Sequence, residues 1–185
     1  MIFRLSHKLN TKIKAGPLQS LPQEENPFAD WSAHLFVADR TQYIILSNTK
    51  SLYSVVMYAK GITNDSIFID RALNNIREIM SAEGQESVYS RYIVPATASV
   101  RFAKAFDRST TGSMNDLINH ATDCLTDEDL SPYDASMMLN DVLLTALAPN
   151  KSVAYGKPRV AFKELLGKTD TSENTSTMTR SYKVS

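Results

Sequence analysis

The stretch from Asp30 to Met57 constrains the fold more than any other part of the chain. It holds two apolar runs rich in β-branched and aromatic residues, His34 to Val37 and Gln42 to Leu46, with a short polar connection between them. Such a pair is typical of a β-hairpin. A third run, Ser51 to Tyr58, follows a polar turn, and strands joined this closely must be antiparallel because a parallel crossover needs many more residues. The sequence therefore predicts a β-meander over residues 34–58.

The chain before the meander predicts a strand, a helix and a loop. Met1 to Leu5 is expected to form a strand, and Ser6 is a suitable N-cap for a turn or helix from His7 to Ile13. The segment from Ala15 to Phe28 is rich in Pro, Gln, Glu and Asn. This composition predicts a loop that leads into the sheet.

Helices dominate the prediction for the rest of the chain. Asn64, Asp65 or Ser66 caps a long helix whose apolar residues recur every three or four positions, and Gly84 terminates it. The further expected elements are a strand over Val88 to Val94, a strand or helix over Ser99 to Phe106, and helices from Ser113 to about Leu125, from Ser131 through Leu139 and from Arg159 to Leu166.

These elements predict one α+β domain over residues 1–167. Its sheet is expected to be small and mainly antiparallel, built from the N-terminal strand and the meander 34–58, and packed by several helices with a helix-rich C-terminal half. Residues 168–185 are polar and almost without apolar anchors. We expect them to form a flexible tail.

Composition argues against several classes of protein. The formal net charge is zero, so no overall field draws the chain to nucleic acid or to an anionic membrane. No apolar run approaches the roughly 18 residues of a membrane span, and the N-terminus lacks the apolar core of a secretory signal. The single cysteine, Cys124, excludes an intrachain disulfide, suits a reducing compartment and is expected to be buried. We therefore expect a cytoplasmic protein without a membrane partner.

Histidine spacing gives no support for a metal centre. His7, His34 and His120 lie far apart in the sequence and form no metal-binding motif. Nucleotide-binding glycine loops are also missing from the sequence. We expect no metal and no other cofactor.

The hairpin carries the first candidate site. His34, Arg40, Tyr43 and Asn48 could hold an anion or supply an acid–base pair if they share a face of the sheet. Alternation places His34 and Phe36 on one face and their neighbours on the other. The simpler interpretation is a two-sided sheet with polar residues at its edges.

The segment RSTTGSMND, from Arg108 to Asp116, carries the second candidate site. If a helix begins at Ser113, its free N–H groups could receive a phosphate group with Arg108 nearby. However, Asp116 in the first turn would repel an anion and instead resembles the acid of a capping box. A capped structural turn is therefore the simpler interpretation.

Several segments occur together in an order that resembles a known family. They are MIFRLSHKL at the N-terminus, HLF-x3-R-x-QYI in the hairpin, GSMNDL in the second candidate site and YGKPRVAFKELL near the end. Over roughly residues 1–166 the chain is similar to a family of bacterial proteins catalogued only as a domain of unknown function. The resemblance implies a single α+β domain in a bacterial cell and implies no activity.

The hypothesis that fits best is a non-enzymatic binding or regulatory protein that acts through contacts with another protein or with a second copy of itself. The residues expected at its binding surface are Arg40, Tyr43, Arg108, Ser113 and Asn115.

Two alternatives remain at this point. A small enzyme acting on a phosphorylated or nucleotide substrate would use His34 as acid–base, Arg40 and Arg108 as anion contacts, and Asn48 or Asn115 to orient the substrate. Nucleic-acid binding is the second alternative, with cations near aromatic side chains as its basis. The cations that this second alternative uses are Lys8, Lys12, Lys14 and Arg91. The basic and aromatic residues considered for a stacking platform are Arg71, Arg77, Tyr89, Arg91, Tyr92, Arg101, Phe102 and Lys104.

Overall fold

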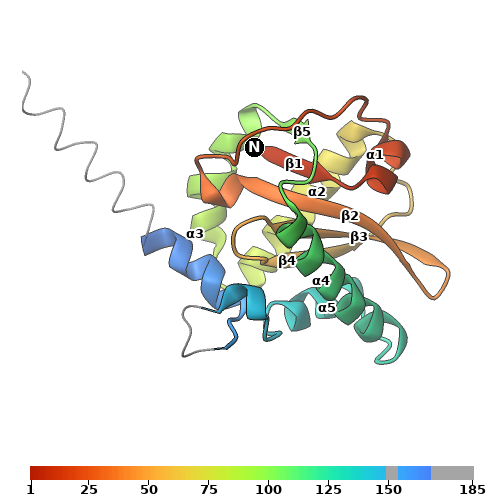
Figure 1. Ribbon diagram of the computed structural model, residues 1–185, viewed down its shortest axis with the longest axis vertical. Coiled ribbons are helices and arrows are strands. Elements are labelled where there is room, and N and C mark those ends of the chain that lie inside the picture. The colour runs from red at the N-terminus through yellow and green to blue at the C-terminus, as the bar shows by residue number, and fades with distance from the viewer. Residues whose placement is uncertain (149–153, 168–185) are drawn as a thin grey trace, which may run out of the picture.

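The computed structural model describes residues 1–148 and 154–167, and within them five strands form one sheet in the order β4-β3-β2-β1-β5 (Figure 1). Strands β2, β3 and β4 form the predicted antiparallel meander, whereas β1 is parallel to both β2 and β5. The α+β class is confirmed, and the sheet is mixed rather than purely antiparallel. The strands are β1 (Ile2–Leu5), β2 (Asp30–Ala38), β3 (Thr41–Asn48), β4 (Ser54–Tyr58) and β5 (Arg101–Ala103).

The helices start where side chains cap their free N–H groups. Ser6, Asn64 and Ser131 accept hydrogen bonds at the starts of α1, α2 and α5, as the sequence predicts. A final helix covers residues 158–167, and the expected tail at 168–185 lies outside the described residues. The named helical elements are α1 (His7–Ile13), η1 (Pro27–Ala29), α2 (Asp65–Ala82), α3 (Glu86–Val88), η2 (Tyr89–Ile93), η3 (Pro95–Ala98), α4 (Arg108–Thr126), α5 (Pro132–Leu139) and η4 (Thr145–Leu147).

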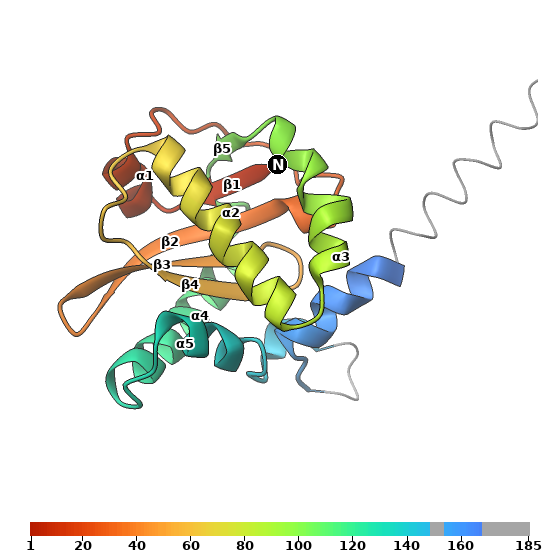
Figure 2. The ribbon, with the colours of Figure 1, turned by 180° about the vertical axis from the view of Figure 1, so that it is seen from behind.

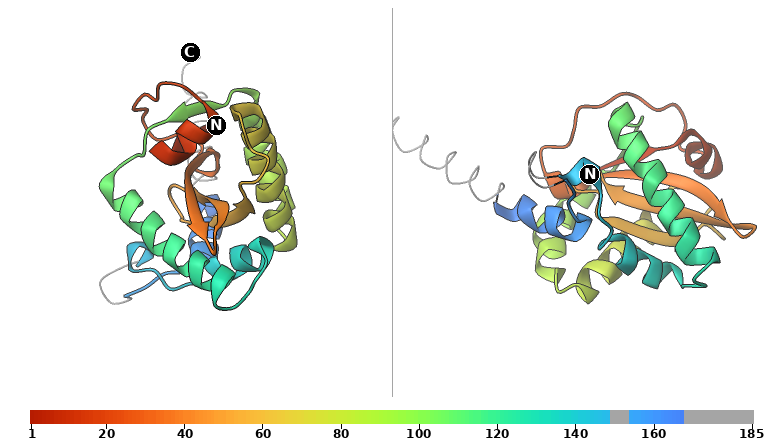
Figure 3. Two further views of the ribbon diagram at one scale, coloured as in Figure 1. Left: turned by 90° about the vertical axis from the view of Figure 1, so that its right-hand side faces the viewer. Right: turned by 60° about the horizontal axis from the view of Figure 1, so that its bottom comes forward.

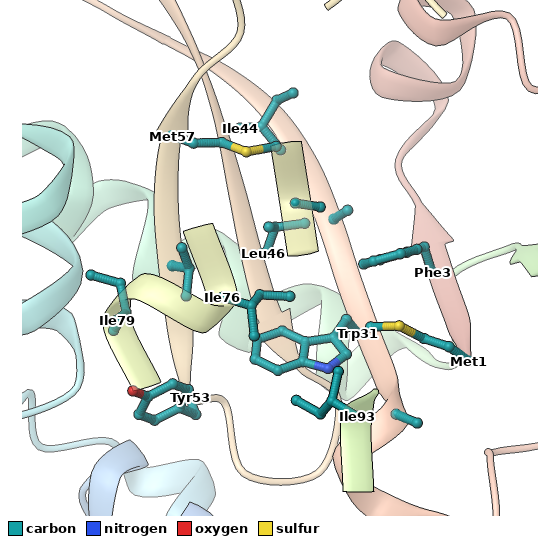
Figure 4. Packing of buried hydrophobic residues seen from close by; sticks show 14 of the residues in the cluster. Met1, Phe3, Trp31, Ile44, Leu46, Tyr53, Met57, Ile76, Ile79 and Ile93 are labelled. Carbon is teal, nitrogen blue, oxygen red and sulfur yellow. The ribbon is translucent and has the colours of Figure 1, made fainter. Parts of the chain in front are cut away.

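Helices cover both faces of the sheet (Figure 3). Helix α2 lies on one face (Figure 2), and its buried side chains pack with those of β1 to β4 around Trp31 (Figure 4). Helices α4 and α5 pack against Phe36, Ile45 and Val56 on the other face, where Cys124 is buried as expected. Alternation along β2 thus divides it between two cores, with Trp31 and Leu35 facing α2 and Phe36 facing α4.

A buried ion pair fastens the loop before β2 to the sheet. The Arg4 guanidinium donates to both carboxylate oxygens of Asp30, each at 2.7 Å, and also to the carbonyl oxygens of Leu21 and Pro22. The carboxylate in turn accepts from the Thr49 hydroxyl at 2.8 Å. Because both charged side chains are 1% exposed, these hydrogen bonds replace the water that the charges lose.

The strand expected over Val88 to Val94 is wrong, because this segment is helical in α3 and η2. Its β-forming side chains suggest a strand, yet Val88, Tyr89, Tyr92 and Ile93 are buried while Ser90 and Arg91 are exposed. That spacing is helical rather than alternating. The aromatic stacking platform considered for nucleic acid therefore does not form at the two tyrosines.

The helix start expected at Ser113 is also wrong. Helix α4 begins at Arg108 and is capped by Asp107, whose carboxylate accepts from the Thr110 N–H at 2.7 Å. This backbone hydrogen bond holds the pKa of Asp107 below its usual value. Ser113 lies inside the helix, so its N–H group is not a free donor for an anion.

Candidate functional site

A groove of about 900 Å³ lies between α1, the outer part of β2 and α4. Its floor is formed by strand residues, and its two walls are formed by the helices. The residues that line it are Ser6, His7, Lys8 and Thr11 from the start of α1, His34, Leu35, Phe36 and Val37 from β2, Gln42 from β3, and Asn115 and Ile118 from α4.

The groove exists because β2 is longer than its parallel neighbour. Strand β1 pairs with β2 only as far as Leu5 opposite Ala33, and the chain then turns into α1 (Figure 1). The pairing of β2 with β3 continues to Ala38 opposite Thr41. The last part of β2 therefore has a hydrogen-bonded neighbour on one side and the groove on the other.

Backbone hydrogen-bonding groups of β2 point into this groove. The Ser6 N–H donates to the Ala33 carbonyl oxygen at 2.9 Å, and the Leu35 N–H reaches only the Ser6 Oγ at 3.5 Å. Along a strand, the backbone groups of every second residue point to the same edge. Those of Ala33 and Leu35 point to the groove, so the Leu35 carbonyl and the N–H and carbonyl of Val37 must point there as well. None of these three groups has a hydrogen-bond partner in the part of the chain that the structure describes.

The groove has a basic rather than an acidic lining. Among the described residues that line it, Lys8 is the cationic residue type, and none is Asp or Glu. Lys12 lies close by, with its ammonium donating to Gln42 Oε1 at 2.8 Å. Such a lining favours an anionic ligand through direct attraction.

His34 is the hairpin candidate that lies in the groove. Its side chain is partly buried, and this burial lowers the pKa of the imidazole below its ordinary value. The lowered pKa favours the neutral imidazole, which makes no hydrogen bond to the described parts of the chain. A neutral imidazole can donate to or accept from a ligand, but among the described residues that line the groove none is a carboxylate that could orient it for acid–base catalysis.

The other hairpin candidates lie elsewhere. Arg40 is exposed at the hairpin turn with a φ angle of 62°. Tyr43 is buried, and its ring lies 5.7 Å from that of Phe36. Asn48 is buried and holds the turn after β3, because its Oδ1 accepts from the N–H groups of Lys50 and Ser51. Tyr43 and Asn48 therefore have structural roles.

Of the three candidate residues on α4, only Asn115 lines the groove. Ser113 lies two residues before Asn115, which turns it about 160° round the helix and away from the groove. Arg108 is on the same flank as Asn115 but about 10 Å along the helix axis. The structure brings His34 and Asn115 to one groove and does not bring Arg40, Arg108 or Ser113 to them.

The sequence analysis does not identify Lys8, Thr11 and Val37 as residues that line one groove. It assigns Lys8 only to a possible nucleic-acid contact. The available signal was the short N-terminal strand beside a longer hairpin strand, since a length mismatch leaves a strand edge without a neighbour.

The described residues contain neither a cluster of His, Cys, Asp and Glu suited to a metal ion nor a helix long and apolar enough to cross a membrane. A family model described as a domain of unknown function (DUF6933) matches residues 2–161. Comparisons with curated proteins and with solved structures gave no match.

Proposed function

The chain belongs to the DUF6933 family, and we propose that it is a binding protein that acts through protein–protein contacts at the groove between α1, β2 and α4. The groove itself is the observation that carries this proposal. Its floor offers Leu35 and Val37 together with their backbone groups, and Ile118 adds an apolar wall beside the polar Asn115. Mixed apolar and polar surfaces of this kind are typical of protein interfaces.

A protein partner fits better than nucleic acid or an enzyme substrate. The formal net charge of zero gives no general attraction to a phosphate backbone, and Tyr89 and Tyr92 are buried rather than available for stacking. For catalysis, no acidic side chain among the described lining residues would orient or charge the His34 imidazole, and the two candidate arginines do not line the groove. We extend the proposal to a regulatory role in a bacterial cytoplasm, where binding at the groove would control the partner.

The test is to fill the groove while leaving the rest of the surface unchanged. Asn115→Trp places a bulky side chain in the groove, whereas His120→Trp places the same side chain on an exposed position about 140° round α4. A partner protein captured from host-cell extract by the wild-type chain should also be captured by His120→Trp and lost with Asn115→Trp.

Equal capture by all three proteins would contradict the proposal. Gel filtration of the purified chain shows whether the partner is a second copy of the chain or a different protein. If it is a second copy, the wild type should elute as a dimer and Asn115→Trp as a monomer. Both tryptophan variants should keep the urea midpoint of the wild type because both positions are exposed.

A further inference from the structure

We propose that the groove takes an extended, acidic segment of a partner protein, which adds as a strand to the free edge of β2 at Leu35 to Val37. This inference rests on the proposed protein-binding function and specifies how the partner is recognised. The segment would continue the line of β1, in the place that β1 leaves when it ends at Leu5. Strand addition of this kind obtains affinity from backbone hydrogen bonds and specificity from alternate side chains.

The first argument is the contrast between β2 and the two outer strands. The edge of β4 is covered by α5, because Ser136 Oγ accepts from the Val56 N–H at 2.8 Å and the Asn140 side chain bonds both backbone groups of Ser54. At the other end of the sheet, the Gln19 backbone bridges to β5. Exposed edges invite unwanted association and are normally covered. Within residues 1–148 and 154–167, no backbone or side chain pairs with the groove edge of β2 at the Leu35 carbonyl and at Val37, and we take this contrast as the reason that it receives a partner.

The second argument is the geometry of the unpaired groups. The Leu35 carbonyl and the Val37 N–H and carbonyl belong to residues two apart on one strand, so they repeat at about 6.7 Å. This repeat matches the donors and acceptors of an extended peptide and does not match a helix, whose backbone groups bond internally. An incoming strand would satisfy these three groups and could replace the long contact from the Leu35 N–H to Ser6.

The third argument is the charge and shape of the walls. Side chains of an added strand would point alternately toward α1 and toward α4. On the α1 side they would meet Lys8 and Thr11, and on the α4 side they would meet Ile118 and Phe36. Since no described lining residue is acidic, a segment with acidic residues at alternate positions and apolar residues between them is the best complement.

The test uses a displayed library of random 12-residue peptides, selected for binding to the full chain. We expect acidic sequences with alternating apolar residues, whose affinity falls as salt rises. Fluorescence anisotropy then compares one selected peptide on three proteins. Val37→Pro removes the edge N–H and should weaken binding at least tenfold. Val37→Thr changes the side chain but keeps that N–H, so it should weaken binding far less than Val37→Pro. Proline is tolerated at an edge position, and an unchanged urea midpoint verifies the fold.

An independent readout avoids reliance on the proline variant. In the wild-type chain, bound peptide should slow hydrogen exchange at the Val37 amide, because that amide gains a hydrogen-bond partner. If Asn115→Trp abolishes peptide binding but Val37→Pro leaves it unchanged and the Val37 amide stays unprotected, the groove is the binding site and strand addition is wrong. If Asn115→Trp has no effect on peptide or partner, both proposals fail. A selection that yields no binder competing for the groove also overturns strand addition.

Discussion

Asn140→Ala is expected to destabilise the protein strongly by uncovering the edge of β4. The side chain of Asn140 accepts from the Ser54 N–H at 2.7 Å and donates to the Ser54 carbonyl oxygen at 3.0 Å. Both residues are fully buried, so water cannot replace the lost bonds. A buried group left unpaired costs about 1–3 kcal/mol, and two such groups together give a loss of about 3 kcal/mol in the free energy of unfolding.

Urea unfolding measures this loss directly. With a slope of about 2 kcal/mol per M for a small protein, the urea midpoint should fall by about 1.5 M. Asn119→Ala is the matched control, because Asn119 is exposed on α4 and its replacement should shift the midpoint little. A loss below about 1 kcal/mol for Asn140→Ala would refute the reasoning that side chains of α5 and of its C-cap residue serve as the hydrogen-bonded neighbour of β4.

Three further predictions concern the ion pair, the hairpin turn and His34. Arg4→Met leaves the buried Asp30 carboxylate without its cation and should lower the free energy of unfolding, measured with urea, by about 3–5 kcal/mol. The double variant Arg4→Met with Asp30→Leu should recover part of this loss, and losses that simply add would contradict the prediction. Arg40→Gly relieves a left-handed backbone (φ 62°) and should raise the free energy of unfolding by about 1 kcal/mol, so a neutral or lower value would count against it. Burial lowers the pKa of His34 in the folded state, so the unfolded chain binds the proton more readily and stability should decline as pH falls below 6.5. As pH falls from about 8 to about 5, the urea midpoint should decline less for His34→Gln than for the wild type. An equal decline in the two proteins would be evidence against the prediction.

Most elements could be predicted because local patterns carry them. The meander follows from alternating apolar residues and short turns, and α1, α2 and α5 follow from the capping residues Ser6, Asn64 and Ser131. The two errors arose where local signals conflict. At residues 88–94 the aromatic and β-branched residue types favour a strand, but their spacing favours a helix. Ser113 with Asp116 resembles a helix cap, although the residue that caps α4 is Asp107.

The candidate site could be predicted only in part. The sequence assigns His34 and Asn115 to two different segments and joins them only in the enzyme alternative, and the groove that both line depends on how α4 lies across β2. The free edge of β2 depends on how far β1 pairs with it, which no local pattern determines. Tyr43 and Asn48 were plausible ligands by type, yet their environments use them for packing and for the turn.

Backbone NMR of the full chain, titrated with the selected acidic peptide, tests the proposed binding site most directly. Binding at the groove predicts shifts concentrated at Lys8, at His34 to Val37 and at Asn115, with the Val37 amide protected from exchange. A competing surface exists near the C-terminal helix, where Leu143, Tyr155 and Val160 are each at least 50% exposed around a hollow of about 230 Å³. Shifts confined to that surface, with β2 unchanged, would contradict the groove as the site of binding.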